Sequence, residues 1–200
     1  IEGCSAPKYN VANLHAGAVE LFVGKRAKLR YSTIENWSKN MYNLNTKRAI
    51  VDEGGAIEWV SGSFGSHVGY LYPMSILSGK KSTCTFTGIT FAGAGQNLDT
   101  GCKVVLNAPD TSAAIETKSI SKGGGISTFR SSVVATKKAE GSAASVSCQS
   151  LMLDDMSRSD TIPTMDIRCK NVDIGHEATI GRIGDDKVFY LMSRGISEEE

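Results

Sequence analysis

The sequence lacks both an excess of charge of one sign and any long hydrophobic run. It carries 22 basic and 21 acidic side chains, a formal net charge of +1, which gives no electrostatic reason to expect binding to nucleic acid or to a membrane surface. No apolar stretch approaches the roughly 20 residues that a membrane-spanning helix needs. With 40% hydrophobic and 22% charged residues, the 200 residues have the composition of one ordinary globular domain.

Cysteine is scarce, and its spacing argues against two kinds of site. The five cysteines are widely scattered and form no C-x-x-C pair: Cys4, Cys84, Cys102, Cys148 and Cys169. A zinc knuckle needs closely spaced ligand pairs, and a disulfide framework is not typical of so few cysteines in a chain of this size. We therefore expect free thiols in a reducing compartment.

Several catalytic motifs are also missing. Gly79-Lys80-Lys81-Ser82 resembles the end of a P-loop, but the required earlier glycine falls at Met74, so the cradle of backbone amides is absent and we interpret the segment as a turn. There is no G-x-S-x-G elbow and no H-E-x-x-H helix. The glycines at Gly123–Gly125 are predicted to form a plain turn rather than an anion cradle.

What the chain does contain is a series of short segments rich in β-branched and aromatic residues, several of them alternating with polar residues as half-buried strands do. Glycine-rich turn signals separate them and recur roughly every 15 residues from Gly79 onward. The predicted strands are Ala18–Val23, Ala56–Val60, Thr83–Phe91, Cys102–Leu106, Ala113–Lys118, Thr128–Ala135, Ala144–Cys148 and Lys187–Leu191.

This pattern predicts an all-β fold, with sandwich, barrel and solenoid all open. The chain has no Asn-Gly or Asp-Gly dipeptide, the commonest two-residue hairpin turn, and this favours an irregular solenoid over hairpins. Only Pro7–Glu20 and the tail after Ile196 look helical. Ser197 stands three residues before Glu200, the spacing of a capping box. Because the chain also begins at Ile1 rather than Met, we expect an excised core.

Two places could carry chemistry on their residue types alone. Cys148 shares strand parity with Val146, so it is expected to face inward, where a free cysteine is usually a small buried hydrophobe. His176 and Glu177 are neighbours on an expected strand and should point to opposite faces, unless Gly175 permits a bulge that re-aims one of them. By themselves, both places are more typical of structural residues than of a metal site.

Seven segments match a known protein family, and along the whole chain they occur in the same order as in that family. Together they make the chain resemble the core of the SufB/SufD family of iron–sulfur cluster assembly scaffolds, and its SufB branch in particular. The segments are Gly3-Cys4-Ser5-Ala6-Pro7, Tyr31-Ser32-Thr33-Ile34-Glu35-Asn36-Trp37, Tyr42-Asn43-Leu44 with Thr46-Lys47-Arg48-Ala49, Lys122-Gly123-Gly124-Gly125, Ser157-Arg158-Ser159-Asp160-Thr161, Gly175-His176-Glu177-Ala178 and Phe189-Tyr190-Leu191-Met192-Ser193-Arg194-Gly195.

The resemblance implies a right-handed parallel β-helix over residues 1–196, with residues 197–200 beginning a truncated C-terminal helical segment. It implies a cytoplasmic or plastid assembly scaffold rather than an enzyme, dimerising with SufD or a second SufB. A separate SufC ATPase would dock on the C-terminal helices, and a cysteine desulfurase system would donate sulfur. The cargo would be a transient iron–sulfur cluster.

The resemblance also assigns roles to single residues. Cys148 matches a site of cluster assembly, with His176 and Glu177 as candidate ligands, and Gly175 stands where some members have a carboxylate. Cys4 matches the residue that receives sulfur. The positions that line an internal sulfur route between the two cysteines are Glu35, where some members carry Gln, Trp37 and Lys47.

Two other functions remain alternatives. A SufD-like structural partner would share much of this sequence and hold no cluster of its own. A β-helix carbohydrate-active enzyme would use acidic pairs such as Asp154–Asp155 and Asp185–Asp186, although adjacent acids in loops are more often solvated turn residues.

Overall fold

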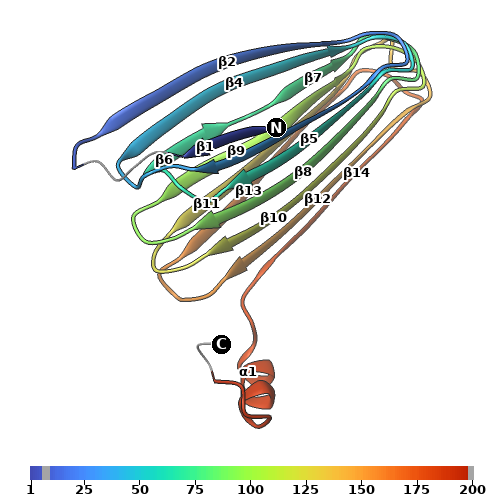
Figure 1. Cartoon of the computed structure of the whole chain (residues 1–200). Helices are drawn as coiled ribbons and strands as arrows, with labels where there is room; N and C mark the ends of the chain where they lie inside the picture. Colours follow the sequence, from blue (N-terminus) through green and yellow to red (C-terminus); the bar gives the residue numbers. More distant parts are fainter. Residues whose placement is uncertain (6–9, 198–200) are drawn as a thin grey trace.

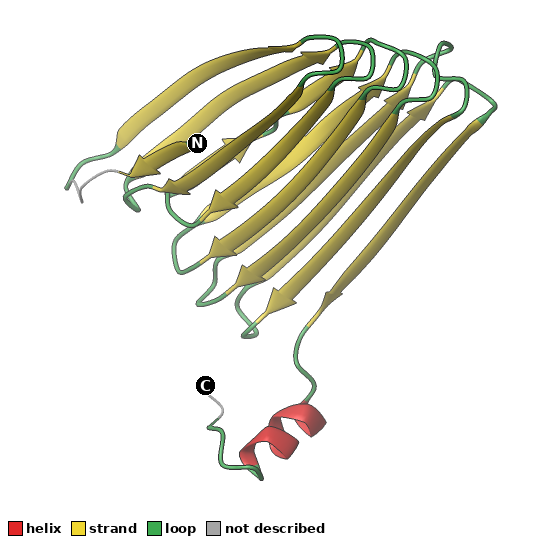
Figure 2. Cartoon of the chain, turned by 45° about the vertical axis from the view of Figure 1, so that its right-hand side comes forward, coloured by secondary structure: helices red, strands yellow, loops and turns green. Residues whose placement is uncertain are grey.

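The computed structural model describes residues 1–5 and 10–197 and shows a flattened β-solenoid. Two seven-stranded parallel sheets lie face to face, and the chain alternates between them through about six turns (Figure 1). The view in Figure 2 shows the strands of both sheets running nearly parallel to one another, with the turns that join them gathered along two edges. The prediction of an all-β parallel β-helix is confirmed.

The first sheet is built from alternate strand segments of the chain, and these strands lie side by side in sequence order. Its strands are β1 Glu2–Ser5, β3 Lys28–Asn36, β5 Ala56–Ser63, β8 Thr83–Ala92, β10 Ser112–Ser121, β12 Ser142–Met152 and β14 Val172–Gly181.

The second sheet faces the first and is built from the strand segments that lie between those of the first sheet in the sequence. Its strands are β2 Asn13–Val23, β4 Met41–Val51, β6 Val68–Leu71, β7 Met74–Leu77, β9 Asn97–Leu106, β11 Ile126–Ala135 and β13 Arg158–Ile167. The short strands β6 and β7 together take the place of one full-length strand between β4 and β9, and each of them pairs with both of those strands.

Strict alternation of burial explains why these residues form strands. β4 is buried at every odd position from Met41 to Val51 and exposed between them, which is the period of a strand with one face in a core. Neighbouring strands pair in register, with a break between β6 and β7, so inward residues stack in columns. One such column runs through Val51, Leu77, Leu106 and Ala135, each fully buried.

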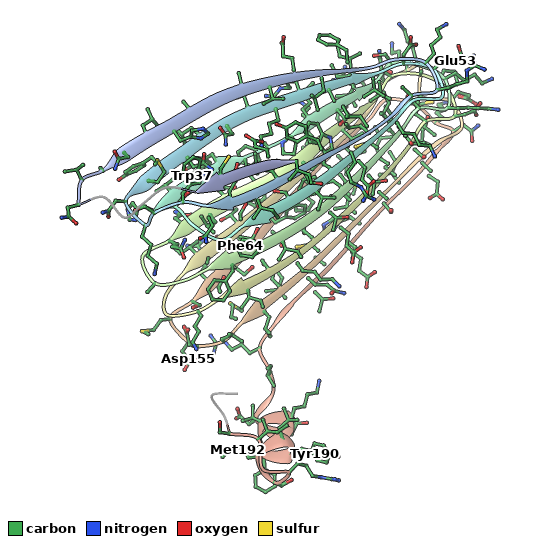
Figure 3. The ribbon with its side chains drawn as sticks, viewed as in Figure 1. Trp37, Glu53, Phe64, Asp155, Tyr190 and Met192 are labelled. Atoms are coloured by element: carbon green, nitrogen blue, oxygen red, sulfur yellow. The ribbon has the colours of Figure 1, made fainter. Side chains whose placement is uncertain are left out.

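The interior is divided lengthwise into an apolar half and a polar half. The apolar half lies beside the turns that contain Glu53, the labelled corner of Figure 3, and it holds stacked residues such as Trp59, Phe86, Ile115 and Val146. Further along the same strands the inward positions become Thr, Ser, Glu and Lys. This polar half is where the candidate residues lie.

Stacked turns close both edges of the solenoid. At the Glu53 corner, made of residues 24–27, 52–55, 78–82, 107–111 and 136–141, backbone amides bond from each turn to the next. These bonds include Arg26 N–H to Glu53 O at 2.8 Å and Asp110 N–H to Glu140 O at 2.8 Å. The turns therefore continue the hydrogen-bonded ladder of the strands around the corner.

Two expectations about local structure are wrong. Residues 13–20 of the expected helix Pro7–Glu20 belong to strand β2, which pairs in register with β4, while residues 6–9 lie outside the described residues. Lys187–Leu191 is not a strand: it lies within helix α1, Asp185–Met192, whose first turn carries Asp185 and Asp186. Acidic side chains there stabilise a helix N-terminus. The other seven predicted strands are confirmed.

Helix α1 stands apart from the β-helix, and none of its residues is buried (Figure 2). The expected capping box runs from Ser197 into residues 198–200, which lie outside the described residues. No helix formed by residues 1–5 and 10–197 is long and apolar enough to cross a membrane.

The closeness of the stacked turns predicts that Gly79→Ala destabilises the fold. A Cβ at Gly79 would lie 1.9 Å from the backbone nitrogen of Glu53, so the backbone of two turns must shift. We expect a loss of at least about 2 kcal/mol in the free energy of unfolding, measured by urea denaturation. Gly175→Ala is the control, because no heavy atom lies within 4 Å of its Cβ. Equal stability of the two variants would contradict the prediction.

Candidate functional site

The first group of candidate residues surrounds a lysine buried in the N-terminal turns. The side chain of Lys47, on β4, is only 3% exposed, and its Nζ lies 2.6 Å from Glu2 Oε2, 2.9 Å from Thr33 Oγ1 and 3.9 Å from Glu35 Oε1. It also lies over the ring of Tyr31, at 5.2 Å from the centroid. An ammonium is tolerated in a protein interior when it is paired and hydrogen-bonded in this way.

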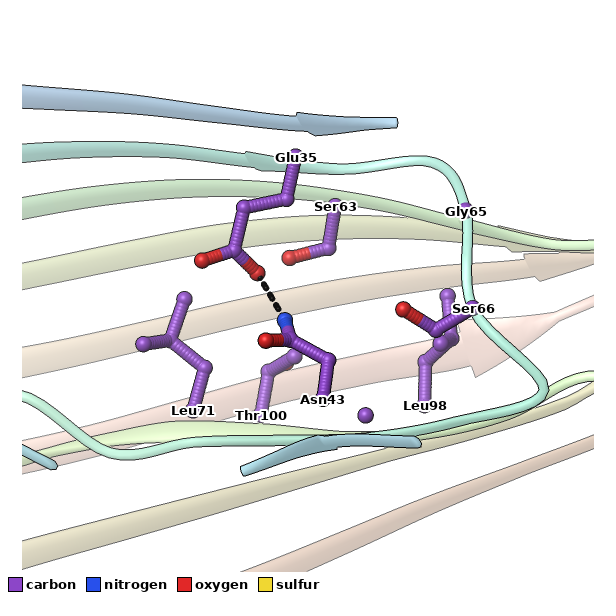
Figure 4. A pocket seen from close by; sticks show the side chains of 9 residues that line it. Glu35, Asn43, Ser63, Gly65, Ser66, Leu71, Leu98 and Thr100 are labelled. Carbon is purple, nitrogen blue, oxygen red and sulfur yellow. Dashed lines mark hydrogen bonds between the residues drawn. The ribbon is translucent and has the colours of Figure 1, made fainter. Parts of the chain in front are cut away.

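Glu35 faces Lys47 from β3 and is equally buried. Its carboxylate accepts hydrogen bonds from Asn43 Nδ2 at 2.5 Å and Asn45 Nδ2 at 3.0 Å. Loss of hydration on burial raises the pKa of Glu35, against the lowering influence of Lys47 and the two amides. Figure 4 shows Glu35 and Asn43 together at the wall of a small cavity of about 10 Å³, which is of the order of one water molecule.

Cys4 lies beside this cluster at the end of the same sheet, on β1. Its thiol donates to Glu2 Oε1 with a sulfur–oxygen distance of 3.6 Å. Desolvation raises the pKa of the Cys4 thiol, and the charges of Glu2 and Glu35 raise it further, while Lys47 lowers it. The net result favours the protonated thiol, because loss of hydration, together with the two carboxylates, outweighs the one ammonium.

Trp37 marks the opposite corner from Glu53, just after β3 ends (Figure 3). Its ring packs against that of His15 with the centroids 4.6 Å apart, and His15 Nδ1 lies 2.8 Å from Asn43 Oδ1. The Trp37 Nε1 is buried without a hydrogen-bond partner among the described residues. Trp37 is therefore connected to Glu35 through His15 and Asn43.

The second group lies at the far end of the same sheet, around Cys148 on β12. Cys148 is 2% exposed, as its parity predicts. Its Sγ lies 3.4 Å from Thr161 Oγ1 on the facing sheet and 3.9 Å from Ser150 Oγ. Thr117 stands opposite it on β10, with a buried hydroxyl that has no hydrogen-bond partner in the described part of the chain. Cys148 thus faces mainly hydroxyl groups.

His176 is on the same inward face as Cys148, one strand further along. It pairs in register with Val146, while Cys148 pairs with Ala178, so the two side chains are diagonal neighbours with backbones roughly 8 Å apart. The His176 Nε2 is buried and has no hydrogen-bond partner within the described ranges. An unpartnered imidazole nitrogen beside a buried thiol is a candidate pair of donors for iron.

Glu177 does not join this pair. The pairing of β12 with β14 is continuous from Ser142 to Leu151, so Gly175 introduces no bulge. Glu177 is exposed on the outer face of the sheet. The expectation that the two neighbours point to opposite faces is confirmed, and of the pair only His176 faces the interior with Cys148.

A column of hydroxyl side chains connects the two groups through the polar half of the interior. In-register pairing places these residues one after another between Glu35 and the neighbourhood of Cys148. Four strand spacings separate the ends, a distance of about 19 Å. We call Ser63, Thr90, Ser119 and Ser150 the hydroxyl column.

Sequence reasoning missed several members of the first group. Asn43, Asn45 and Lys47 share parity on β4, and Glu2 shares parity with Cys4 on β1. A strand with an inward Asn-x-Asn-x-Lys pattern is unusual, because such side chains are seldom buried without partners. That alternation was the available signal for a buried polar cluster.

The other cysteines have structural surroundings. Cys84 and Cys102 are buried against each other in the apolar half, and burial raises the pKa of Cys102 well above its usual value. Cys84 also donates to Ser75 Oγ at 3.4 Å, and Ser75 accepts a bond from Trp59 Nε1 at 2.8 Å. Cys169 is partly exposed, near Glu140.

Other motifs in the sequence resolve into turns. Gly123 donates its amide to Asp154 Oδ2 at 2.5 Å, and Asp154 also accepts amide bonds from Met156 and Ser157. Hydrogen bonds from these groups, that of Gly123 foremost, lower the pKa of Asp154. The chain's own groups therefore occupy the glycine amides: Asp154 accepts from Gly123, Ser157 Oγ from Gly124 at 3.2 Å and Lys122 O from Gly125 at 3.2 Å. Within residues 1–5 and 10–197, no group of three or more His, Cys, Asp or Glu side chains is arranged to hold a metal.

Comparison with known proteins identifies the family that the sequence matches. The family model described as "SUF system FeS cluster assembly, SufBD core domain" matches residues 1–200. The chain is 46% identical over 200 residues to an iron–sulfur cluster assembly SufBD family protein of Staphylococcus saprophyticus and 46% identical to one of Mycobacterium leprae. A Mycobacterium tuberculosis relative is 44% identical. All of this chain is covered, but only 43%, 23% and 24% of these relatives, respectively.

The Lys47 cluster predicts a large stability loss in Lys47→Met, which keeps the length of the side chain and removes its charge. Two buried or half-buried carboxylates would lose their common partner, a change that costs about 3–5 kcal/mol. Urea denaturation measures the change. Lys25→Met is the control, since Lys25 and Glu53 form an exposed pair at 3.6 Å worth about 1 kcal/mol or less. Similar losses in both variants would contradict the assignment.

The charge of Glu2 is predicted to slow reactions of the Cys4 thiol. In Glu2→Gln the pKa of Cys4 should fall, because one of the carboxylates that raise it is neutral, and more of the reactive thiolate is present at neutral pH. Alkylation of Cys4 by iodoacetamide at pH 7.5, followed by mass spectrometry, should be several-fold faster. Glu58→Gln, at an exposed pair with Arg30, should leave the rate unchanged. An unchanged rate in Glu2→Gln would refute this role.

Proposed function

Because the chain belongs to the SufB/SufD core-domain family of the SUF iron–sulfur cluster assembly system, we propose that it is a SufB-type scaffold on which a transient cluster is built. One observation carries the proposal. The buried thiol of Cys148 lies beside an unpartnered, inward-facing nitrogen of His176, and both are connected by the hydroxyl column to the cluster around Lys47 and Cys4.

Cys148 and His176 supply the first ligands to the incoming iron and sulfide. Permanent iron–sulfur proteins generally hold a cluster with four cysteine thiolates. A site with one thiolate and one imidazole from this chain binds more weakly and can release its cargo. The remaining ligands come from a second subunit, SufD or another SufB, placed against the end of the solenoid where β14 is the last strand. Glu177, on the outer face, then serves as a ligand only from that side.

Sulfur enters at Cys4 and moves inside the solenoid. Lys47 stabilises an anionic sulfur species near Cys4, while Glu35 and Trp37 line the start of the route. The hydroxyl column offers donors along the following 19 Å or so toward Cys148. A hydroxyl donates a hydrogen bond to an anion without adding a charge that would trap it. Such a route keeps reactive sulfur away from water and oxidants.

The partners follow from the system to which the family belongs. A cysteine desulfurase system donates the sulfur, and the SufC ATPase drives assembly through the C-terminal helical part of the full protein. Residues 1–196 act as the scaffold core. Exposed Phe189 and Tyr190 on α1 offer an apolar surface beside that helical part. The chain itself performs no catalysis and works in the cytoplasm, or in the plastid of a plastid-bearing eukaryote.

The alternative is a SufD-like partner that holds no cluster. It is favoured by the finding that the described residues of one chain bring together no set of three metal-binding side chains. The two candidates differ in one measurable property, because only a SufB-type scaffold requires its Cys148 for cluster formation.

Replacing Cys148 provides the test. The full-length protein carrying Cys148→Ala is reconstituted anaerobically with its SUF partners, iron and a sulfur donor, and the iron–sulfur charge-transfer absorption is recorded. We expect loss of most of the absorption in this variant and in His176→Ala, because each removes a ligand. The matched control is Cys169→Ala, which removes a partly exposed thiol and should leave the spectrum unchanged.

A normal spectrum in Cys148→Ala would refute the SufB-type assignment and support the SufD-like alternative. Unfolding of each variant is followed in parallel. Cys148 fills a small volume in the interior, so Cys148→Ser serves as a second variant that conserves its size and tests the sulfur itself.

A further inference from the structure

A basic hollow lies on the outside of the Glu53 corner, away from the polar interior. It spans the turns after β7, β9 and β11 and has a volume of about 580 Å³. That is within the usual range for small-molecule sites. The polar side chains that line it are Ser78, Lys80, Asn107, Lys137, Lys138 and Glu140.

The charges of this hollow are unbalanced. Three lysines face one carboxylate, and that carboxylate is already engaged: Glu140 accepts a bond from Asn171 Nδ2 at 2.8 Å and one from the Cys169 thiol. Lys80 lies 3.5 Å from Asp110 in an exposed pair. Among the described residues, no carboxylate lies within ion-pair distance of Lys137 or Lys138. Two ammonium groups are therefore available to an anion.

Neutral donors add to this excess. The amide N–H of Lys138 donates to Thr136 Oγ1 at 3.2 Å, and the Thr136 hydroxyl donates to Asn107 Oδ1 at 3.2 Å. This chain of bonds orients the side-chain amide of Asn107, and its NH₂ group donates to no acceptor among residues 1–5 and 10–197. The hydroxyl of Ser78 also lines the hollow. Donors outnumber free acceptors, so the complementary ligand is rich in acceptor oxygens.

The hollow is held open by the stacking of its turns. Asn107 N–H bonds to Leu77 O at 3.1 Å, and Lys81 N–H bonds to Pro109 O at 3.1 Å. Lys81 adopts a positive φ of 60°, which a non-glycine residue rarely does. The backbone beneath the lysines is therefore fixed before any ligand arrives, and a preformed site loses less entropy on binding.

We propose that this hollow is a binding site for a phosphate-bearing anion. Lysine recognises phosphate as a point charge, and clustered cations in a concave surface concentrate anions from solution. The absence of an arginine from the lining argues against bidentate carboxylate recognition. The proposal is independent of the cluster-assembly site, since none of its residues belongs to the Lys47 cluster, the hydroxyl column or the surroundings of Cys148.

The test is a calorimetric titration of the chain with inorganic pyrophosphate and, separately, with a nucleoside triphosphate. Saturable 1:1 binding that weakens as salt is raised is expected. In the double variant Lys137→Gln/Lys138→Gln, affinity should fall about tenfold, as expected when two exposed ammonium–phosphate contacts are lost. Tighter binding of the triphosphate than of pyrophosphate would support the site and add the nucleoside to its ligand.

The matched control is Lys118→Gln/Lys122→Gln, which removes two exposed charges elsewhere on the solenoid. It should bind as the unaltered chain does. No binding of either ligand at millimolar concentration would overturn the proposal. So would an equal loss of affinity in both double variants, because the attraction would then come from diffuse surface charge.

Discussion

The structure depends on one constraint: each turn of the chain lies parallel to and in register with the next. Because of this register, residues that are one turn apart in the sequence, 26 to 32 positions, become neighbours at one strand spacing. Each inward side chain therefore adds to a column that runs from turn to turn. The residue types that recur at that position decide whether the column is apolar or polar. Valine, leucine and isoleucine build the apolar half, while serine and threonine build the hydroxyl column. The apolar core and the hydroxyl column follow from the same rule.

Apolar burial in one half of the interior offsets the cost of burying polar and charged side chains in the other half. Burying Lys47 with Glu2 and Glu35 carries a desolvation cost that ion pairing only partly offsets. The stacked Trp59, Phe86, Ile115 and Val146 supply apolar burial on the same strands. The cluster has two carboxylates for one ammonium, and the pKa of Glu35 is raised as a result of its burial. The solenoid thus sustains charges in its interior without unfolding around them.

Most of the fold could be predicted from sequence, and the exceptions have physical causes. Seven of the eight expected strands were predicted correctly, because the alternation of apolar and polar residues can be recognised within each segment alone. The segment 13–20 was mistaken for a helix because pairing with β4, rather than propensity, decides its conformation. The inward position of Cys148 followed from parity. Neither Asn43 nor Glu2 could be placed beside Glu35 and Lys47 without knowing how the sheets face each other, because the Asn43–Glu35 contact joins the two sheets and the Glu2–Lys47 contact joins residues 45 positions apart.

The stacking of one turn on the next has a consequence for how such a protein changes over time. In the described part of the chain, each strand pairs with the strands of the adjacent turns, so stability is close to a sum of local terms. The chemistry around Lys47 and the chemistry around Cys148 are several turns apart. Substitutions in one are expected to leave the other's geometry intact, and inserting or deleting a whole turn would lengthen or shorten the distance between them. The solenoid is in this sense a modular scaffold whose two ends can evolve separately.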